Sequence, residues 1–393
     1  MDDVVIVSGV RTAIGRFGGG FAKTSVSDLG SAVIKEAVSR AGLEPGQIDQ
    51  VILGTAGQFT DAYVARTAAI GAGLPHSTPA FTVNRLCGSG LEAINEGARW
   101  IETGDAQIVV AGGAENMSRY PYLVNDARWG KRMGNSTMED GVTTILSDPF
   151  ERYHMGMTAE HLAERWGLSR EALDEHAVGS HEKAIAAIDA GRFTEQIVPV
   201  EVRTGRNKTA MIDTDEHPRR DATLESMSSL RPAFKPDGDV TAGNASGIND
   251  GAGAVVMMGA KTAAALGLEP KLRLVGRANS GVDPAIMGTG PIPATERVME
   301  RTGLRADDMD VIELNEAFSS VALVCSRELG LNAERTNPNG GAVALGHPVG
   351  ATGVILTVKA MYELERTQSQ YGLVTLCIGG GQGIATVFER VSN

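Results

Sequence analysis

Cysteine is scarce in this chain, and its spacing argues against two classes of structure. The 393 residues contain three cysteines, and no two of them form a CxxC pair. An odd, widely spaced set does not suit a disulfide framework and favours a reducing compartment. Two cysteines and a histidine could ligate zinc, but no pair has zinc-finger spacing, so we predict no metal site.

Long basic runs and long apolar runs are also missing. The net charge is -12, and without a basic run we expect no nucleic-acid partner. No apolar run is long enough to cross a bilayer, so we expect no membrane association. The first residues enter a strand-like run with no signal segment, and the last four match no retention tail. We therefore expect a cytoplasmic protein.

The chain does contain a regular alternation of strand-like and helix-like segments. Strands are expected at 4–7, 50–53 and 108–111, the last ending at Gly112-Gly113, and helices at 28–41 and 63–71. Strands that are apolar throughout are typical of a sheet covered on both faces. The sequence therefore predicts an α/β protein.

The alternation loosens between about residues 118 and 241. Helices are expected at 157–166 and 170–190. Polar stretches elsewhere in the region, such as 202–208, are interpreted as irregular. We interpret this region as a large insertion. Its arginines supply the local positive charge that an acidic protein needs for an anionic ligand, although a merely solvated face is the more common fate of exposed arginines.

An internal repeat relates the two ends of the chain. The pattern of residues 42–53 returns at 303–314, after a second amphipathic helix. Further along, 87–90 is matched in position by 347–350, and we expect each to open a long helix, with Pro348 at the first helical position. Two copies of one α/β unit that meet face to face would bring equivalent loops to one site.

Cys87 is the first candidate residue for chemistry. It follows an extended segment and precedes a helix whose apolar positions are Leu91, Ile94, Ala98 and Ile101. The start of a helix stabilises a thiolate, so we expect a lowered pKa and a reactive sulfur. The alternative is a structural cysteine packed between strand and helix.

Three further residues end strands or open helices in the second half. His347 occupies the position equivalent to Cys87, Asn315 follows the strand at 311–314, and Cys377 ends the strand at 373–376. A cysteine and a histidine that face each other form an activated nucleophile. Taken singly, His347 could be a structural histidine and Asn315 a strand-end cap.

These loops resemble those of the thiolase family, and the resemblance runs over essentially the whole chain. The stretches that carry it are 84–90, 112–118, 154–160, 241–251, 315–318, 340–353 and 377–383. The resemblance implies a thiolase fold, with duplicated βαβαβαββ halves in an α-β-α-β-α arrangement. It also implies an N-terminal half at 1–268, with an inserted loop domain at about 119–247, and a C-terminal half at 269–393.

The resemblance further implies reversible thiolysis of 3-ketoacyl-CoA, or Claisen condensation of acetyl-CoA, through an acyl-cysteine. Cys87 would be the nucleophile, and His347 would take its proton and then hold an oxyanion with a water positioned by Asn315. Cys377 would be the second acid/base, with a thiol pKa that needs little tuning. The N–H groups of Cys87 and Gly379 would form another oxyanion hole.

Coenzyme A would be a substrate held by the insertion, with no tightly bound cofactor. Arg219 aligns near the adenine–phosphate end, and Arg220 beside it would assist. The positions that match the pantetheine arm are Leu146, His154, Met155, Phe234, Ala242, Ser246, Ala317 and Phe318. Relatives imply a homotetramer that is a dimer of dimers.

Two other functions are weighed against this one. A decarboxylating 3-ketoacyl synthase shares the fold and the nucleophilic cysteine, but that family uses a different His/Asn or His/His set. A non-catalytic acyl-CoA-binding relative would not need Cys87, His347, Asn315 and Cys377 together. We therefore favour the acyltransferase.

Overall fold

The computed structural model describes residues 2–59 and 61–391. Its first part contains β1 (Val4–Thr12), β2 (Gly15–Arg16), α1 (Val26–Arg40), β3 (Gln50–Gly54), α2 (Val64–Gly71), β4 (Ala80–Val83), α3 (Ser89–Thr103), β5 (Ile108–Asn116) and β11 (Asn249–Gly259). Its last part contains α8 (Ala260–Leu266), β12 (Leu272–Gly281), α9 (Pro291–Thr302), β13 (Val311–Leu314), α10 (Ser319–Leu329), α11 (Ala342–Leu345), α12 (Thr352–Thr367), β14 (Tyr371–Ile378) and β15 (Gln382–Arg390).

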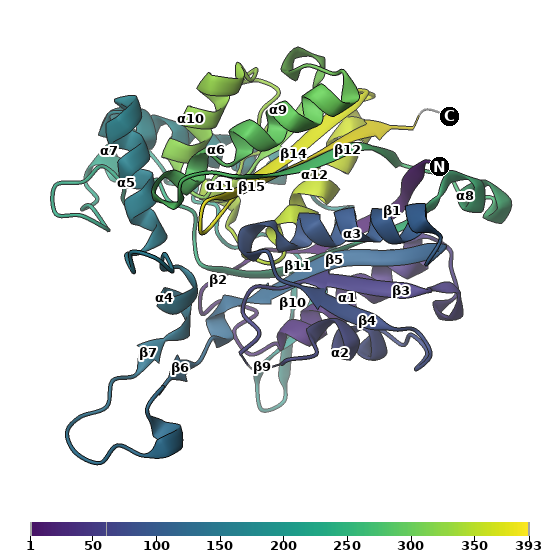
Figure 1. Ribbon diagram of the computed structural model, residues 1–393, viewed down its shortest axis with the longest axis horizontal. Helices are drawn as coiled ribbons and strands as arrows, with labels where there is room; N and C mark the ends of the chain where they lie inside the picture. The colour runs from purple at the N-terminus through teal and green to yellow at the C-terminus, as the bar shows by residue number, and fades with distance from the viewer. Residues whose placement is uncertain (1, 60, 392–393) are drawn as a thin grey trace.

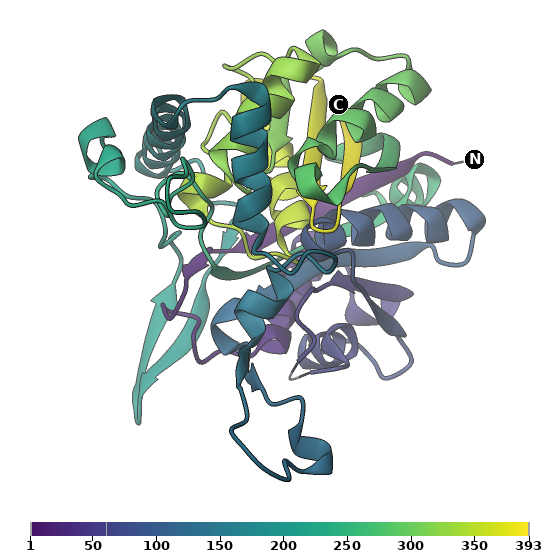
Figure 2. The same cartoon turned by 60° about the vertical axis from the view of Figure 1, so that its left-hand side comes forward.

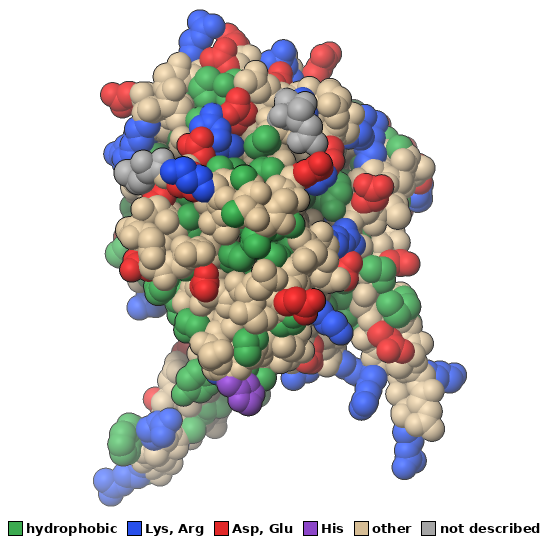
Figure 3. All heavy atoms as spheres, turned by 90° about the vertical axis from the view of Figure 1, so that its right-hand side faces the viewer, with side chains coloured by type: hydrophobic (Ala, Val, Ile, Leu, Met, Phe, Trp, Pro, Cys, Tyr) green, Lys and Arg blue, Asp and Glu red, His purple; other side chains and the backbone are tan. Residues whose placement is uncertain are grey.

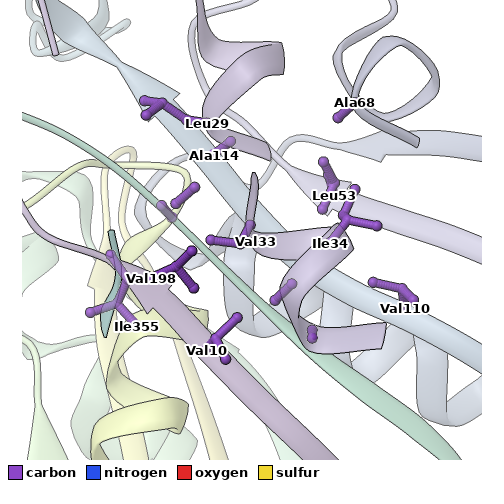
Figure 4. Close-up of a cluster of buried hydrophobic side chains, with 14 of the residues drawn as sticks. Val10, Leu29, Val33, Ile34, Leu53, Ala68, Val110, Ala114, Val198 and Ile355 are labelled. Carbon is purple, nitrogen blue, oxygen red and sulfur yellow. The ribbon is translucent and has the colours of Figure 1, made fainter. Parts of the chain in front are cut away.

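The local sequence explains where helix α1 begins and ends. The Ser25 hydroxyl accepts a hydrogen bond from the Asp28 N–H at 3.0 Å, and Gly42 follows the helix with a positive φ. An N-cap serine and a glycine after the last turn satisfy the backbone groups that helix ends leave unpaired. The apolar face of α1 packs on the sheet through residues that include Leu29, Val33 and Ile34 (Figure 4).

The strands form one sheet built from two halves. Its order is β13-β14-β15-β12-β1-β11-β5-β3-β4. Among the described residues, the two halves of the sheet are joined by the pairing of β1 with β12, through Val5 with Arg273 and Ile6 with Leu272. β3 is parallel to both β4 and β5 in one half, and β13 is parallel to β14 in the other.

Helices separate and cover the two half-sheets (Figure 1). α1 and α2 cover the outer face of the first half, α9 and α10 lie on the outer side of the second, and α3 and α12 pack against each other between them. Three hydrophobic clusters fill the spaces between these layers. The predicted α-β-α-β-α arrangement is confirmed.

The second half departs from the full βαβαβαββ order at one strand. The segment equivalent to β4 is reduced to an isolated bridge between Ile312 and Thr336. The chain then continues through the short helix α11 to α12.

Residues 117–248 form the region that interrupts the first half. Its elements are β6 (Tyr122–Leu123), β7 (Glu139–Asp140), α4 (Gly141–Ile145), α5 (Met155–Trp166), α6 (Arg170–Asp189), β8 (Ile197–Val198), β9 (Val200–Gly205), β10 (Lys208–Ile212) and α7 (Leu224–Ser228). The loop between β6 and β7 projects from the body, as does the β9–β10 hairpin (Figure 2). In Figure 3 two projections that carry basic side chains extend below the body.

Two local expectations were wrong. Residues 202–208 are not irregular, because β9 and β10 pair as an antiparallel hairpin. β5 does not stop at Gly112-Gly113 but runs through both to Asn116. A side chain at Gly113 would collide with the backbone of Gly350, so this glycine permits a close approach of the loop before α12 rather than ending the strand.

No helix within 2–59 and 61–391 is both long enough and apolar enough to cross a membrane.

Candidate active site

Cys87 lies in a tight turn between β4 and α3. The turn is a single 3₁₀ turn (Leu86–Gly88), and Leu86 has a φ of 44°. The Asn84 side chain accepts the Leu86 N–H at 3.0 Å, and the Ser89 hydroxyl donates to the Leu86 carbonyl at 2.6 Å. A left-handed leucine costs about 1–2 kcal/mol, and these side-chain bonds hold it in place.

Glycines allow the start of α12 to approach this turn. A side chain at Gly90 would place its Cβ 2.9 Å from the Val354 nitrogen and 3.0 Å from the Gly350 carbonyl oxygen. A side chain at Gly353 would collide with Leu91. The predicted meeting of equivalent loops from the two halves therefore depends on glycine at the contact.

His347 is buried, and hydrogen bonds fix its ring. Its backbone N–H donates to Asn249 Oδ1 at 2.9 Å, and its Nδ1 lies 2.6 Å from Thr352 Oγ1. The Thr352 hydroxyl donates its one proton to the Pro348 carbonyl at 3.0 Å, so its oxygen must accept the hydrogen bond from His347 Nδ1–H. We therefore assign the unprotonated nitrogen of the neutral ring to Nε2, which lies 3.4 Å from Asn315 Nδ2.

His347 does not open a helix as expected. α12 begins at Thr352, and Pro348 lies in the preceding turn. Burial lowers the pKa of His347 to about 4. The ring is therefore a neutral base at neutral pH.

The expected lowering of the Cys87 pKa was also wrong. Burial raises the pKa of the thiol to about 11, although hydrogen bonds from the N–H groups of Gly379 and Cys87 oppose the rise. The loss of hydration, which raises the pKa, outweighs the stabilisation of the thiolate by the start of the helix. Cys87 is a neutral thiol at rest, and a base must take its proton when it attacks.

Asn315 and Cys377 lie at one edge of the sheet. β13 and β14 are parallel and pair Leu314 with Thr375, and the Asn315 N–H donates to the Thr375 carbonyl at 3.0 Å. Both candidate side chains are fully buried. Burial raises the pKa of Cys377 well above its usual value, so the expectation that this thiol needs little tuning was wrong.

Glu316 fixes the Asn315 loop, and sequence reasoning missed it. Its carboxylate accepts hydrogen bonds from the Ser180 hydroxyl at 2.7 Å, Asn337 Nδ2 at 2.9 Å and the Val343 N–H at 3.2 Å. Burial raises its pKa, but His176 and these bonds outweigh burial and lower the pKa to about 2. Three distant segments thus hold the residue beside Asn315.

A cavity of about 390 Å³ opens onto Cys87. Arg219 and all eight predicted pantetheine positions line it, together with Cys87, His347 and Gly379. Asn315 and Cys377 are not part of its lining. The lining residues that were not predicted are Met117, His217, Ala233, Ala245, Gly247, Ile248, Met287 and Val349.

Aromatic rings form one wall of this cavity. The rings of His154 and Phe234 stack at 4.7 Å, and Phe318 meets Phe234 edge-on at 6.0 Å. A side chain at Gly156 would collide with Phe234. The wall is rigid and apolar, as a passage for an uncharged arm requires.

Positive charge at the cavity comes from Arg219 rather than from its neighbour. Arg219 lines the cavity, and its N–H donates to His181 Nδ1 at 3.1 Å. Arg220 forms an exposed ion pair with Asp189 and does not line the cavity, so it does not assist Arg219 there. Across 2–59 and 61–391, no three His, Cys, Asp or Glu side chains gather as a metal site would need.

Replacing Thr352 by valine is expected to slow the alkylation of Cys87 by iodoacetamide at neutral pH roughly tenfold. The reason is that His347 Nδ1–H loses its hydrogen-bond acceptor, so the ring is no longer held in its orientation. The rate is measured by mass spectrometry of the Cys87 peptide. Thr357→Val is the matched control, because Thr357 is buried in the same helix and donates only to the Gly353 carbonyl. Equal slowing in both variants would contradict the role of Thr352.

Comparisons with known proteins agree with this geometry. Residues 4–261 match the family model described as "Thiolase, N-terminal domain", and residues 268–390 match "Thiolase, C-terminal domain". Beta-ketothiolase BktB of Cupriavidus necator is 52% identical over 392 residues, covering 99% of each chain. An acetyl-CoA acetyltransferase of Pseudomonas aeruginosa is 50% identical, covering 99% of this chain and 100% of its own.

Solved structures give the same result. The crystal structure of the Bacillus anthracis acetyl-CoA acetyltransferase has a TM-score of 0.98 at 44% identity, covering 100% of this chain and 99% of that one. Human mitochondrial 3-ketoacyl-CoA thiolase in complex with CoA has a TM-score of 0.96 at 41% identity, covering 100% and 98%. The chain therefore belongs to the thiolase family.

Proposed function

We propose that this protein is an acetyl-CoA C-acyltransferase that cleaves 3-ketoacyl-CoA with coenzyme A and, in reverse, condenses acetyl-CoA. The observation that carries the proposal is the arrangement around the Cys87 sulfur. A neutral histidine with an unprotonated Nε2 and two backbone N–H groups lie at the end of an apolar cavity that also contains Arg219. Nothing in this site favours the decarboxylating synthase or the non-catalytic relative.

In thiolysis, His347 Nε2 takes the Cys87 proton as the sulfur attacks the 3-keto carbon. The N–H groups of Cys87 and Gly379 hold the oxyanion, where such donors are worth a few kcal/mol each. The bond between C2 and C3 breaks, and Cys377 gives its proton to C2 of the departing acetyl-CoA enolate. Cys87 is left acylated, His347 protonated and Cys377 ionised.

The second half-reaction restores all three groups. The Cys377 thiolate takes the proton of the incoming coenzyme A thiol, which attacks the acyl carbon. The Cys87 sulfur leaves and recovers its proton from His347. Asn315 Oδ1 has no hydrogen-bond partner within the part of the chain that the structure describes, which suits a bound water that holds the enolate oxygen with His347.

Coenzyme A is proposed as the substrate that fills the cavity. Arg219 would take the adenine–phosphate end and the apolar wall would take the pantetheine arm, with no tightly bound cofactor. The cavity lining and the likeness to a thiolase solved with CoA support this assignment.

The test is coenzyme A-dependent cleavage of acetoacetyl-CoA and 3-ketohexanoyl-CoA, measured side by side. Incubation with acetyl-CoA alone is expected to add one acetyl group to the Cys87 peptide, seen by mass spectrometry. Cys325 is the internal control, because it is fully buried and its thiol donates to the Gly288 carbonyl. Binding without cleavage or acylation would overturn the proposal.

The assembly and the domain limits are also proposed. We infer halves at 1–268 and 269–393 with the insertion at about 119–247. A homotetramer of two dimers is supported by large apolar side chains on the projecting loop, where Trp129 is 90% and Met133 84% exposed, and by β4 at a sheet edge. All three cysteines are free thiols, which supports a cytoplasmic location.

A further inference from the structure

The segment that carries Arg219 has no regular secondary structure. After β10 ends at Ile212, residues 213–221 contain neither helix nor strand. Yet His217 and Arg219 both line the cavity. Hydrogen bonds and ion pairs of side chains, more than a regular series of backbone hydrogen bonds, must therefore fix the position of this segment.

A buried ion pair anchors the segment to the first strand. Arg11 Nη1 and Nη2 donate to the two carboxylate oxygens of Asp215 at 2.7 and 2.9 Å, and both side chains are 0% exposed. Asp215 also accepts the Ile14 N–H at 2.8 Å, and Arg11 Nε donates to Gln196 Oε1 at 2.7 Å. The Arg11 guanidinium lies 4.9 Å from the centre of the Phe193 ring.

Further bonds hold the segment on both sides of Asp215. Glu216 donates its N–H to the Ile14 carbonyl at 3.0 Å, and its carboxylate accepts the Gly20 N–H at 3.1 Å. On the other side, the Arg219 N–H reaches His181 in α6. The segment is thus held between the end of β1 and α6, with Asp215 four residues before Arg219.

Stability alone does not account for such a pair. Removing two charges from water offsets much of their attraction, and an apolar pair of similar volume is often no less stable. What a bidentate arginine–carboxylate pair adds is a fixed geometry. Here the fixed pair holds the segment that places His217 and Arg219 at the cavity.

We propose that Arg11 and Asp215 are positioning residues for the nucleotide end of the substrate, because they fix the segment that presents Arg219 to the cavity. This inference rests on the proposed role of Arg219. It concerns substrate binding only, since neither residue lines the cavity.

The test compares substrates with and without the nucleotide. Cleavage is measured with acetoacetyl-CoA and coenzyme A, and again with S-acetoacetyl-pantetheine and pantetheine. The variant is Arg11→Met with Asp215→Asn, which leaves no unpaired buried charge and keeps an acceptor for the Ile14 N–H. We expect KM for the coenzyme A substrates to rise roughly five- to tenfold at unchanged kcat, with the pantetheine substrates unaffected.

Two controls separate the possible results. Arg220→Met with Asp189→Asn removes the exposed ion pair of the same region and is expected to change neither KM. Arg219→Ala is expected to raise KM for the coenzyme A substrates only. If Arg219→Ala affects both substrate pairs equally, the proposed nucleotide role of Arg219 fails, and the positioning role fails with it.

The positioning role alone is overturned by either of two results. One is a selective effect of Arg219→Ala with no effect of the double variant. The other is an equal loss on both substrate pairs in the double variant, which indicates a structural role. Should the double variant not fold, Arg11→Lys keeps the charge but loses the bidentate geometry, and a smaller selective rise in KM is expected; no selective rise overturns the inference.

Discussion

Cys377→Ala is expected to reduce cleavage of acetoacetyl-CoA by about three orders of magnitude and to slow acetyl transfer to Cys87 far less. Cys377 is fully buried, and its raised pKa keeps it protonated at rest. It is therefore placed to give a proton to the enolate, and loss of a general acid costs roughly 10²–10⁴ in rate. Acetylation of Cys87 by acetyl-CoA requires no enolate and uses His347 as the base. In this step Cys377 only protonates the departing coenzyme A thiolate, a stable leaving group that water can protonate instead.

The measurement is a pair of assays on the same protein. Cleavage is followed by loss of acetoacetyl-CoA, and transfer is followed by the acetyl group on the Cys87 peptide. Cys325→Ala is the matched control, because it removes another fully buried thiol of the second half outside the cavity lining, and both assays should survive. If Cys377→Ala lowers both activities to the same extent while remaining folded, the division of roles between the two cysteines is wrong.

His347→Ala is expected to lower both activities by about 10³–10⁴ at neutral pH. The reason is the state of the nucleophile. A thiol with a pKa of about 11 is ionised in roughly one molecule in ten thousand at pH 7, so without a base only this fraction can attack. In the proposed mechanism the native protein avoids this limit, because His347 takes the proton during the attack.

The pH dependence distinguishes loss of the base from misfolding. The native rate should be nearly constant above pH 5, since the pKa of His347 is about 4 and the ring stays neutral there. The variant rate should instead rise about tenfold per pH unit as the Cys87 thiolate accumulates. A variant with little activity and no dependence on pH would contradict the assignment of His347 as the base.

The sequence by itself determined which chemical groups this site contains. Cys87, Asn315, His347 and Cys377 each lie in a short motif at a strand end or helix approach, and such motifs are local in the chain. The repeat of 42–53 at 303–314 was enough to predict two units whose equivalent loops meet. The coenzyme A positions were predicted from motif matching, and all of them except Arg220 line one cavity.

Only the tertiary structure decided the pKa values of the Cys87 and Cys377 thiols. From the sequence, the start of a helix predicted a lowered pKa for Cys87, and the ordinary value of a thiol was expected to suit Cys377. Both pKa values are raised instead, because segments far apart in the chain close around these thiols and exclude water. Desolvation depends on what surrounds a group in space, so no local pattern contains it.

Local sequence patterns also could not predict which residues hold the site in position. Glu316 beside Asn315 is bound by Ser180, Asn337 and Val343, and Arg11 is bound to a residue 204 positions away. Such partners have no fixed spacing in sequence. The motifs therefore determined the proposed reacting groups, whereas long-range burial and pairing decided how those groups are held and when they carry a proton.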